Sequence, residues 1–224
     1  MRIDIISAVP DLLESPLNIS ILKRARDKKK VEIVVHNLRD YAHDKHKQID
    51  DKPFGGGPGM ILKPEPFFEC IEKLQSERKY KHIIFTTPKG KIFEQKTANR
   101  FSLAENIIII AGHYKEIDDR VREYFATDEI SIGNFVLTGG ELPALIIVDA
   151  VIRLIPGVLN DSEAALKDSF QDGEIIETQY YTRPAEYRGM KVPDVLLSGN
   201  EKEINKWKEE QSKKLTEKWK KFNN

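Results

Sequence analysis

Asn106-Ile107-Ile108-Ile109-Ile110-Ala111 is an almost wholly apolar run dominated by β-branched residues, and such runs are typical of buried β-strands. Three further strand-like runs lie at residues 2–6, 31–36 and 82–86. Two other stretches, residues 11–28 and 64–78, carry apolar residues at helical spacing and predict helices, and residues 141–155, apolar around most of the circumference, predict one more, buried helix. This alternation predicts an α/β fold in which helices cover a mostly parallel sheet.

The composition is that of a globular protein, with 224 residues, 40% apolar residues and a formal net charge of zero. No apolar run approaches the roughly 20 residues that span a bilayer, so a membrane protein is not expected. The N-terminus lacks the pattern of a secretory signal, and the single cysteine, Cys70, excludes an internal disulfide. Both observations favour a cytoplasmic protein.

The chain is expected to form two domains joined by a linker. The strand and helix pattern occupies residues 1–159, a polar and turn-rich linker follows at 160–173, and residues 174–224 form a small helical C-terminal domain. Lysine-rich clusters lie at residues 23–30 and 202–221. Each cluster is either a solvated helix face or a surface for RNA phosphates, and the zero net charge favours neither.

Residues 53–60, Pro-Phe-Gly-Gly-Gly-Pro-Gly-Met, form a glycine-rich loop. Such a loop lets backbone amides approach a bulky or anionic ligand, although a plain flexible loop has the same composition. It is not a Walker loop, because no Gly-Lys-Ser/Thr follows. Just before it, Lys45, His46 and Asp50 either contact a phosphate or base or belong to an ordinary charged loop, and their spacing does not suit zinc.

Residues 131–143 run from a turn through a short apolar strand into a glycine pair and then a helix. Such a junction can cradle a cofactor, and the alternative is a plain strand-to-helix turn. No Gly-x-Gly-x-x-Gly motif follows the first strand, which disfavours a Rossmann dinucleotide site.

A set of short motifs runs in order through almost the whole chain. They are Lys45-His46-Lys47 with Asp50, residues 53–60, Gly112-His113-Tyr114, Ile117-Asp118, residues 131–133 and 136–143, Arg153 with residues 155–158, Asp168-Ser169-Phe170, and residues 181–184. Together they closely resemble the bacterial tRNA (guanine-N1)-methyltransferase family. The resemblance implies the SPOUT fold, with a deep trefoil knot and S-adenosylmethionine bound in a bent conformation in residues 1–159.

The resemblance also assigns roles to individual residues. It implies Asp168 as the catalytic base and Arg153 as the catalytic arginine. The implied cofactor-binding residues are Thr86, Thr87, Pro88, Gly112, Ile132, Gly133, Asn134, Phe135, Val136, Leu137, Gly139 and Gly140. The expected substrate-binding residues are Lys45, His46, Asp50, Gly55, Gly56, Gly57 and Gly59.

The activity implied is methyl transfer to N1 of guanosine 37, beside the tRNA anticodon. The resemblance further implies a Mg²⁺ requirement with unidentified ligands, a C-terminal domain that grips the anticodon stem-loop, and a homodimer with its active site at the subunit interface. Two alternatives are an RNA-binding protein that has lost catalysis and a phosphate-binding transferase that uses residues 53–60.

This chain departs from the family pattern in three places. Lys115-Glu116 stands where many members have Glu-Gly, Asn134-Phe135 stands where Asp-Tyr is usual, and the C-terminus is shorter and richer in lysine. The first departure removes an acidic group, and the second removes one charge and one hydroxyl group.

Overall fold

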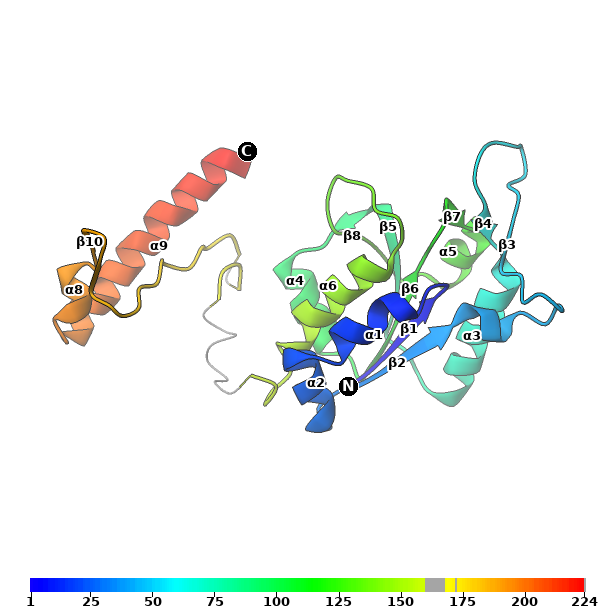
Figure 1. Ribbon diagram of the computed structural model, residues 1–224, viewed down its shortest axis with the longest axis horizontal. Coiled ribbons are helices and arrows are strands. Elements are labelled where there is room, and N and C mark those ends of the chain that lie inside the picture. The colour runs from blue at the N-terminus through cyan, green and yellow to red at the C-terminus, as the bar shows by residue number, and fades with distance from the viewer. Residues whose placement is uncertain (160–167, 172, 224) are drawn as a thin grey trace. The chain divides into compact units, whose positions relative to one another are not determined.

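The computed structural model describes residues 1–159, 168–171 and 173–223 (Figure 1). The chain divides into two compact units, residues 1–161 and 162–224. The functions expected of the two domains stay predictions.

A five-stranded sheet forms the centre of the first unit (Figure 1). Its strands are β1 (Arg2–Ser7), β2 (Glu32–Asn37), β5 (His82–Ile92), β6 (Asn106–Ala111) and β8 (Asp128–Ser131). Their order is β2-β1-β6-β5-β8, and every neighbouring pair is parallel. The mostly parallel sheet of an α/β fold is thereby confirmed, whereas the trefoil knot stays a prediction.

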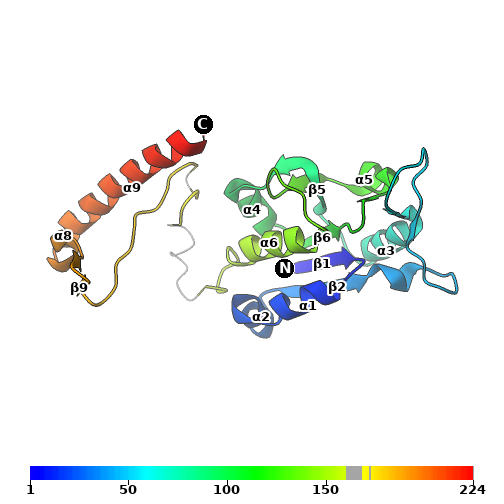
Figure 2. The same ribbon diagram turned by 45° about the horizontal axis from the view of Figure 1, so that its top comes forward.

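Helices cover both faces of this sheet. On one face α1 (Asp11–Leu17), α2 (Ser20–Asp27), α4 (Gln95–Ser102) and α6 (Glu141–Ile152) contribute to one apolar cluster, with α6 against both α1 and α4 (Figure 2). The opposite face is covered by the short 3₁₀ helix η1 (Leu38–Tyr41), α3 (Pro64–Glu77) and α5 (Asp119–Phe125).

Strand β6 shows why the sequence gives this layering. Ile107 and Ile109 belong to the first apolar cluster and Ile108 and Ile110 to the second, because successive side chains in a strand point to opposite faces. All four are fully buried, and each contributes roughly 1.5–3 kcal/mol from the burial of its side chain. An uninterrupted apolar run is therefore what a parallel strand covered on both faces requires.

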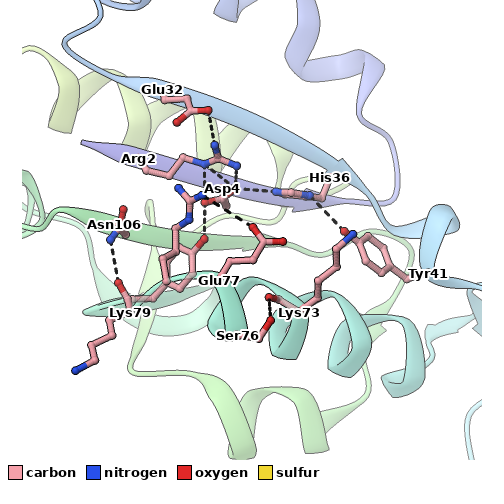
Figure 3. Close-up of polar contacts among 12 residues, drawn as sticks. Arg2, Asp4, Glu32, His36, Tyr41, Lys73, Ser76, Glu77, Lys79 and Asn106 are labelled. Carbon is pink, nitrogen blue, oxygen red and sulfur yellow. Dashed lines mark hydrogen bonds and ion pairs between the residues drawn. The ribbon is translucent and has the colours of Figure 1, made fainter.

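One carboxylate is buried within the sheet, Asp4 of β1 (Figure 3). His36 Nε2 lies 2.7 Å from Asp4 Oδ1, the Tyr80 hydroxyl donates to Oδ2 at 2.8 Å, and the Arg2 guanidinium donates to both oxygens. Burial by itself raises the pKa of Asp4, but these donors outweigh it and hold the pKa below its ordinary value of 3.8. The carboxylate is therefore kept charged inside the fold.

A small second sheet flanks the glycine-rich loop. It contains β3 (Asp50–Asp51), β4 (Ile61–Leu62) and β7 (Glu116–Ile117), in the order β3-β4-β7. The antiparallel pair β3 and β4 closes the loop of residues 52–60, and β7 pairs with β4 in parallel. This sheet thereby fixes the loop beside the segment that follows β6.

The second unit is built around α9 (Glu201–Asn223), preceded by the two-residue strands β9 (Glu186–Tyr187) and β10 (Met190–Lys191) and by α8 (Asp194–Leu197). Residues 175–182 belong to no helix or strand, and Ile176 among them is hydrogen-bonded to α9. The Ser212 hydroxyl donates to Ile176 O at 2.5 Å, and Thr216 Oγ1 accepts from Ile176 N at 2.9 Å. The expected helical C-terminal region is thus present.

The structure corrects three local predictions. The helix expected at residues 11–28 is two helices, because the chain turns at Asn18 and Ile19 and enters α2 through Ser20 at φ 51°. Helix α6 ends at Ile152 instead of residue 155. The apolar segment at residues 135–137 is an irregular loop and not a strand.

Most of the expected linker, residues 160–167 and 172, lies outside the described residues. Within the described part of the chain, no helix combines the length and apolar character needed to cross a membrane.

Candidate active site

A cavity lies where β6 and β8 end, next to the middle of β5. Ligands of open α/β sheets bind outside the carboxyl ends of the strands, so the position is suited to a binding site. Together with its open mouth, the cavity encloses about 720 Å³ of space. Its walls come from segments 86–88, 112–116, 130–133, 135–140 and Pro143.

Eleven of the twelve expected cofactor-binding residues line this one cavity, the exception being Asn134. Sequence reasoning missed eight further lining residues: His113, Tyr114, Lys115, Glu116, Ile130, Ser131, Thr138 and Pro143. Lys115 had stood out only as a departure from the family pattern. The structure brings the segments together, while the cofactor-binding role of each residue stays a prediction.

The loop between β8 and α6 forms the apolar side of the cavity. Phe135, Val136 and Leu137 expose 54%, 84% and 38% of their surface, although all three line the cavity. Apolar side chains that remain so exposed are able to gain burial when an apolar or aromatic group binds against them. This wall is therefore suited to a flat, partly apolar ligand.

The glycine pair Gly139-Gly140 joins this loop to the end of β6. The Gly140 amide donates to Gly112 O at 2.6 Å, and Gly139 forms a β-bridge with His113. A Cβ on Gly140 would lie 2.8 Å from the Gly112 nitrogen, and one on Gly139 would lie 2.6 Å from His113 Nδ1. Gly140 therefore requires glycine because the backbones of residues 111 and 112 approach it so closely, whereas at Gly139 the nearest atoms belong to the side chains of Glu141 and His113.

A buried carboxylate supports the floor of the site. Glu141 is 1% exposed, accepts a hydrogen bond from Ser7 Oγ at 2.8 Å, and lies 3.4 Å from His113 Nδ1. It occupies the first turn of α6, where the helix dipole favours negative charge. Glu141 thereby connects the start of α6 to Ser7 at the end of β1 and to His113 just after β6.

The two expected catalytic residues belong to different units. Arg153 follows α6 directly in the first unit, is half-buried, and donates its backbone amide to Asp149 O at 3.3 Å. Asp168 belongs to the second unit and is also half-buried. Neither residue lines the cavity.

A second carboxylate, Glu177, accompanies Asp168. Its pKa is raised above the ordinary value, first by burial and then by the negative charge of Asp168. Its backbone amide donates to Ser169 Oγ at 2.9 Å. Glu177 was not foreseen from the sequence, where it reads as an ordinary acidic residue of an extended segment.

The expected substrate-binding residues lie beside the cavity rather than in it. Lys45 and His46 are exposed, and Asp50 belongs to β3. The four glycines of residues 53–60 all have positive φ, and none lines the cavity. Their loop is nevertheless joined to the cavity rim, because Lys115 N donates to Met60 O at 3.1 Å. Their contacts with a substrate stay predictions.

Potential metal ligands are scattered. Among residues 1–159, 168–171 and 173–223, no group of three or more histidine, cysteine or acidic side chains is placed to hold a metal ion. A Mg²⁺ ion bound mainly by substrate phosphates needs no such group. The described residues therefore identify no protein site for the ion.

Comparisons with known proteins place this geometry in a family. The sequence profile of the tRNA (guanine-1)-methyltransferase family, TrmD, matches residues 1–221. The chain is 57% identical over 216 residues to the tRNA (guanine-N(1)-)-methyltransferase of Chlorobaculum tepidum, with 96% of this chain and 94% of the relative covered. The enzymes of the same name from Cytophaga hutchinsonii and Bacteroides fragilis are 57% and 54% identical, with 96% of this chain and 92% and 96% of the relatives covered.

Proposed function

The chain belongs to the tRNA (guanine-1)-methyltransferase family and is a tRNA (guanine-N1)-methyltransferase, and we propose that it methylates guanosine 37 with S-adenosylmethionine as the donor. The observation that carries the proposal is the cavity at the carboxyl ends of the strands, which gathers eleven of the twelve residues that the family resemblance assigns to the cofactor. We also propose that the protein is cytoplasmic and acts on the anticodon loop of tRNA.

The residues of the cavity fit such a donor. The close approach at Gly139-Gly140 leaves backbone groups near the space where a ligand enters, and residues 135–137 supply an apolar wall for an adenine ring. When bound, S-adenosylmethionine supplies a methyl group on a positively charged sulfur, which is already electrophilic. The protein must therefore activate the nucleophile, N1 of guanine.

We assign that task to Asp168. N1 of neutral guanine carries a proton and a delocalised lone pair, so a base must remove the proton as the methyl group is transferred. A positioned carboxylate contributes about 10²–10⁴-fold to such a reaction. Glu177 lies near this base, since after burial the negative charge of Asp168 contributes to the raised pKa of Glu177.

Arg153 is proposed to stabilise the charge that develops on guanine O6. As N1 loses its proton, negative charge moves onto O6, and a planar, permanently charged guanidinium is a suitable donor for it. Arg153 directly follows α6, whose first turn reaches the cavity at Pro143, and its backbone amide donates to Asp149 O. Asp168 would then accept the N1 proton while Arg153 stabilises the negative charge on the neighbouring O6.

The active site is proposed to combine two protomers of a homodimer, one giving the cavity and Arg153 and the other giving Asp168. Co-expressed Arg153→Ala and Asp168→Ala chains test this arrangement. If the site is shared, mixed dimers retain one intact site, and the mixture shows about one quarter of wild-type activity for random pairing of symmetric subunits. An inactive mixture would place both residues of each site in the same chain.

The second unit is proposed to hold the anticodon stem-loop through phosphates. Four exposed lysines of α9 are available for this, namely Lys206, Lys208, Lys213 and Lys214. A base in a tRNA loop is splayed out at low cost and read on its Watson–Crick edge, which makes guanosine 37 reachable. The family resemblance implies Mg²⁺ as well, and we derive no step through it.

The test of the proposed function is transfer of labelled methyl from S-adenosylmethionine to tRNA that carries guanosine at positions 36 and 37. Label is expected at N1 of guanosine 37 and should be absent from a transcript with adenosine there. Binding of tRNA without transfer would favour a non-catalytic RNA-binding protein. Label at another position would disprove the target assignment while leaving the donor in place.

A further inference from the structure

A lysine on the rim of the cavity, Lys115, has no role in the proposed function. Lys115 is exposed, lines the cavity, and directly follows Tyr114, whose φ of 61° places it in the left-handed region. A non-glycine residue rarely adopts that conformation, and such strain is concentrated at functional sites. The turn directs Lys115 away from the β6 end and toward the glycine-rich loop.

The side chain of Lys115 lies along that loop. Its Cβ is 3.2 Å from the point where a Cβ would stand on Gly59, and its Nζ is 3.6 Å from the corresponding point on Gly57. The Lys115 amide also donates to Met60 O, so the main chain fixes the start of this path. The ammonium group is thereby held between the cavity and the loop.

Charges around the rim leave this ammonium available. The neighbouring Glu116 is paired with Lys89, whose Nζ lies 2.9 Å from Glu116 Oε2. Across the described residues, the Lys115 side chain forms no ion pair or hydrogen bond. The amides of Gly55, Gly57 and Gly59 likewise donate to no carbonyl within the described part of the chain. Around Gly55 and Gly56 the space is open, with no atom within 4 Å of an added Cβ.

We propose that the Lys115 ammonium, together with the amides of the glycine-rich loop, binds a phosphate of the RNA backbone beside the target guanosine. An unpaired cation next to free amide donors is a site for an oxyanion. The loop continues away from the cofactor cavity, so its ligand is the RNA rather than the donor. The inference rests on the proposed function and gives the lysine at position 115 a role that a glutamate could not fulfil.

The experiment compares Lys115→Met, which keeps the aliphatic stem against Gly59, with Lys115→Arg and Lys115→Glu. Lys79→Met is the control, because Lys79 is an exposed lysine just before β5, at the opposite end of the strands (Figure 3). The readouts are KM and kcat for tRNA, affinity for S-adenosylhomocysteine, and the slope of log affinity for tRNA against log salt.

For Lys115→Met we expect KM for tRNA to rise about three- to tenfold at low salt, as for the loss of one ordinary hydrogen bond at an exposed position. The salt slope should fall by about 0.7–0.9, the value for one phosphate. Affinity for S-adenosylhomocysteine and kcat should stay unchanged. Lys115→Arg should restore binding, Lys115→Glu should weaken it further, and Lys79→Met should have no effect.

Two results would overturn the inference while leaving the methyltransferase activity intact. Weaker binding of S-adenosylhomocysteine by Lys115→Met, with unchanged binding of 5′-methylthioadenosine and an unchanged tRNA salt slope, would show that the anion is the donor carboxylate. Unchanged values in every assay would show that Lys115 only packs on the loop. Failure of the wild type to methylate tRNA would instead contradict the proposed function.

Discussion

Residues 1–161 bury their apolar side chains in two clusters on either side of a sheet, whereas the described residues of the second unit bury only Thr178. In that second unit Tyr180, Tyr187, Met190 and Leu197 each expose more than half of their surface. The first unit therefore has its own core, and the described residues of the second unit have no comparable core.

The same division applies to the chemistry. The cavity and its supporting carboxylate Glu141 belong to the part with a core, while the proposed base Asp168 belongs to the part without one. A cavity built on packed elements keeps its geometry before any ligand arrives. We propose that a base on such a weakly packed segment is positioned when the substrate is in place, so that proton removal is restricted to the bound complex.

The largest effect should come from Asp168→Ala. We expect kcat to fall by about 10²–10⁴-fold because the general base is lost. Affinity for S-adenosylhomocysteine and the melting temperature should stay at wild-type values, because Asp168 lies outside both the cavity and the buried clusters. Single-turnover transfer measures the loss of catalysis, and calorimetry measures the affinity for S-adenosylhomocysteine and the melting temperature. A parallel loss of cofactor binding would contradict the division between the units.

A pair of core substitutions compares the two units directly. Ile109→Ala in β6 should reduce the free energy of unfolding by about 2–5 kcal/mol, since it leaves a cavity in a fully packed site. Leu197→Ala in α8 should cost less than about 1 kcal/mol, because that side chain is 58% exposed. Urea denaturation checks both values. Similar losses at the two positions would mean that the second unit has a core of its own.

Charge reversal on α9 should have the next largest effect. Replacing Lys206, Lys208, Lys213 and Lys214 by glutamate should weaken tRNA binding by about tenfold or more at low salt and flatten its salt dependence. Reversal of Lys28, Lys29 and Lys30 in the first unit, compared with reversal of Lys206, Lys208 and Lys213 alone, tests charge at equal number and should change binding less. Cofactor affinity should not change in either variant. Equal effects of the two sets would show a general charge effect without a specific RNA surface.

The smallest effect concerns acid stability. Because the pKa of Asp4 is lowered in the folded state, its contribution is complete above the ordinary value of 3.8 and is lost as the pH falls through the lower folded pKa. Unfolding free energies measured from neutral pH down to acid should therefore decline less steeply below pH 3.8 for Asp4→Asn than for the wild type. Parallel curves would show that Asp4 does not contribute to acid unfolding.

Much of the first unit follows from its sequence. The strands at residues 2–6, 31–36, 82–86 and 106–111 were predicted to within a residue at the start, because continuous β-branched runs suit a sheet covered on both faces. Strand β8 was missed, since Asp128 and Glu129 interrupt its apolar character. The two-residue strands β3, β4 and β7 carry no period that a sequence pattern could show.

The site was less accessible to sequence reasoning. The apolar residues 135–137 favoured a strand. In the structure they line a cavity and do not pair with a neighbouring strand, and only the tertiary structure decides between these two outcomes. Arg153 and Asp168 attracted attention only through the family resemblance, since neither the spacing nor the local composition marks them. Lys115 likewise needed the structure, because only the fold brings it against Gly57 and Gly59.

The close approach of Gly139 and Gly140 to the end of β6 also limits how this enzyme can change under selection. A side chain at Gly140 would overlap the backbone of Gly112, so a resistant variant at this position would distort the site itself, and one at Gly139 would have to displace the side chains of Glu141 and His113. Resistance to an inhibitor that contacts the glycine pair would then have to arise by mutation of exposed side chains on the rim of the cavity, such as Phe135 and Lys115. Compounds that avoid those two side chains would present the smallest target for resistance.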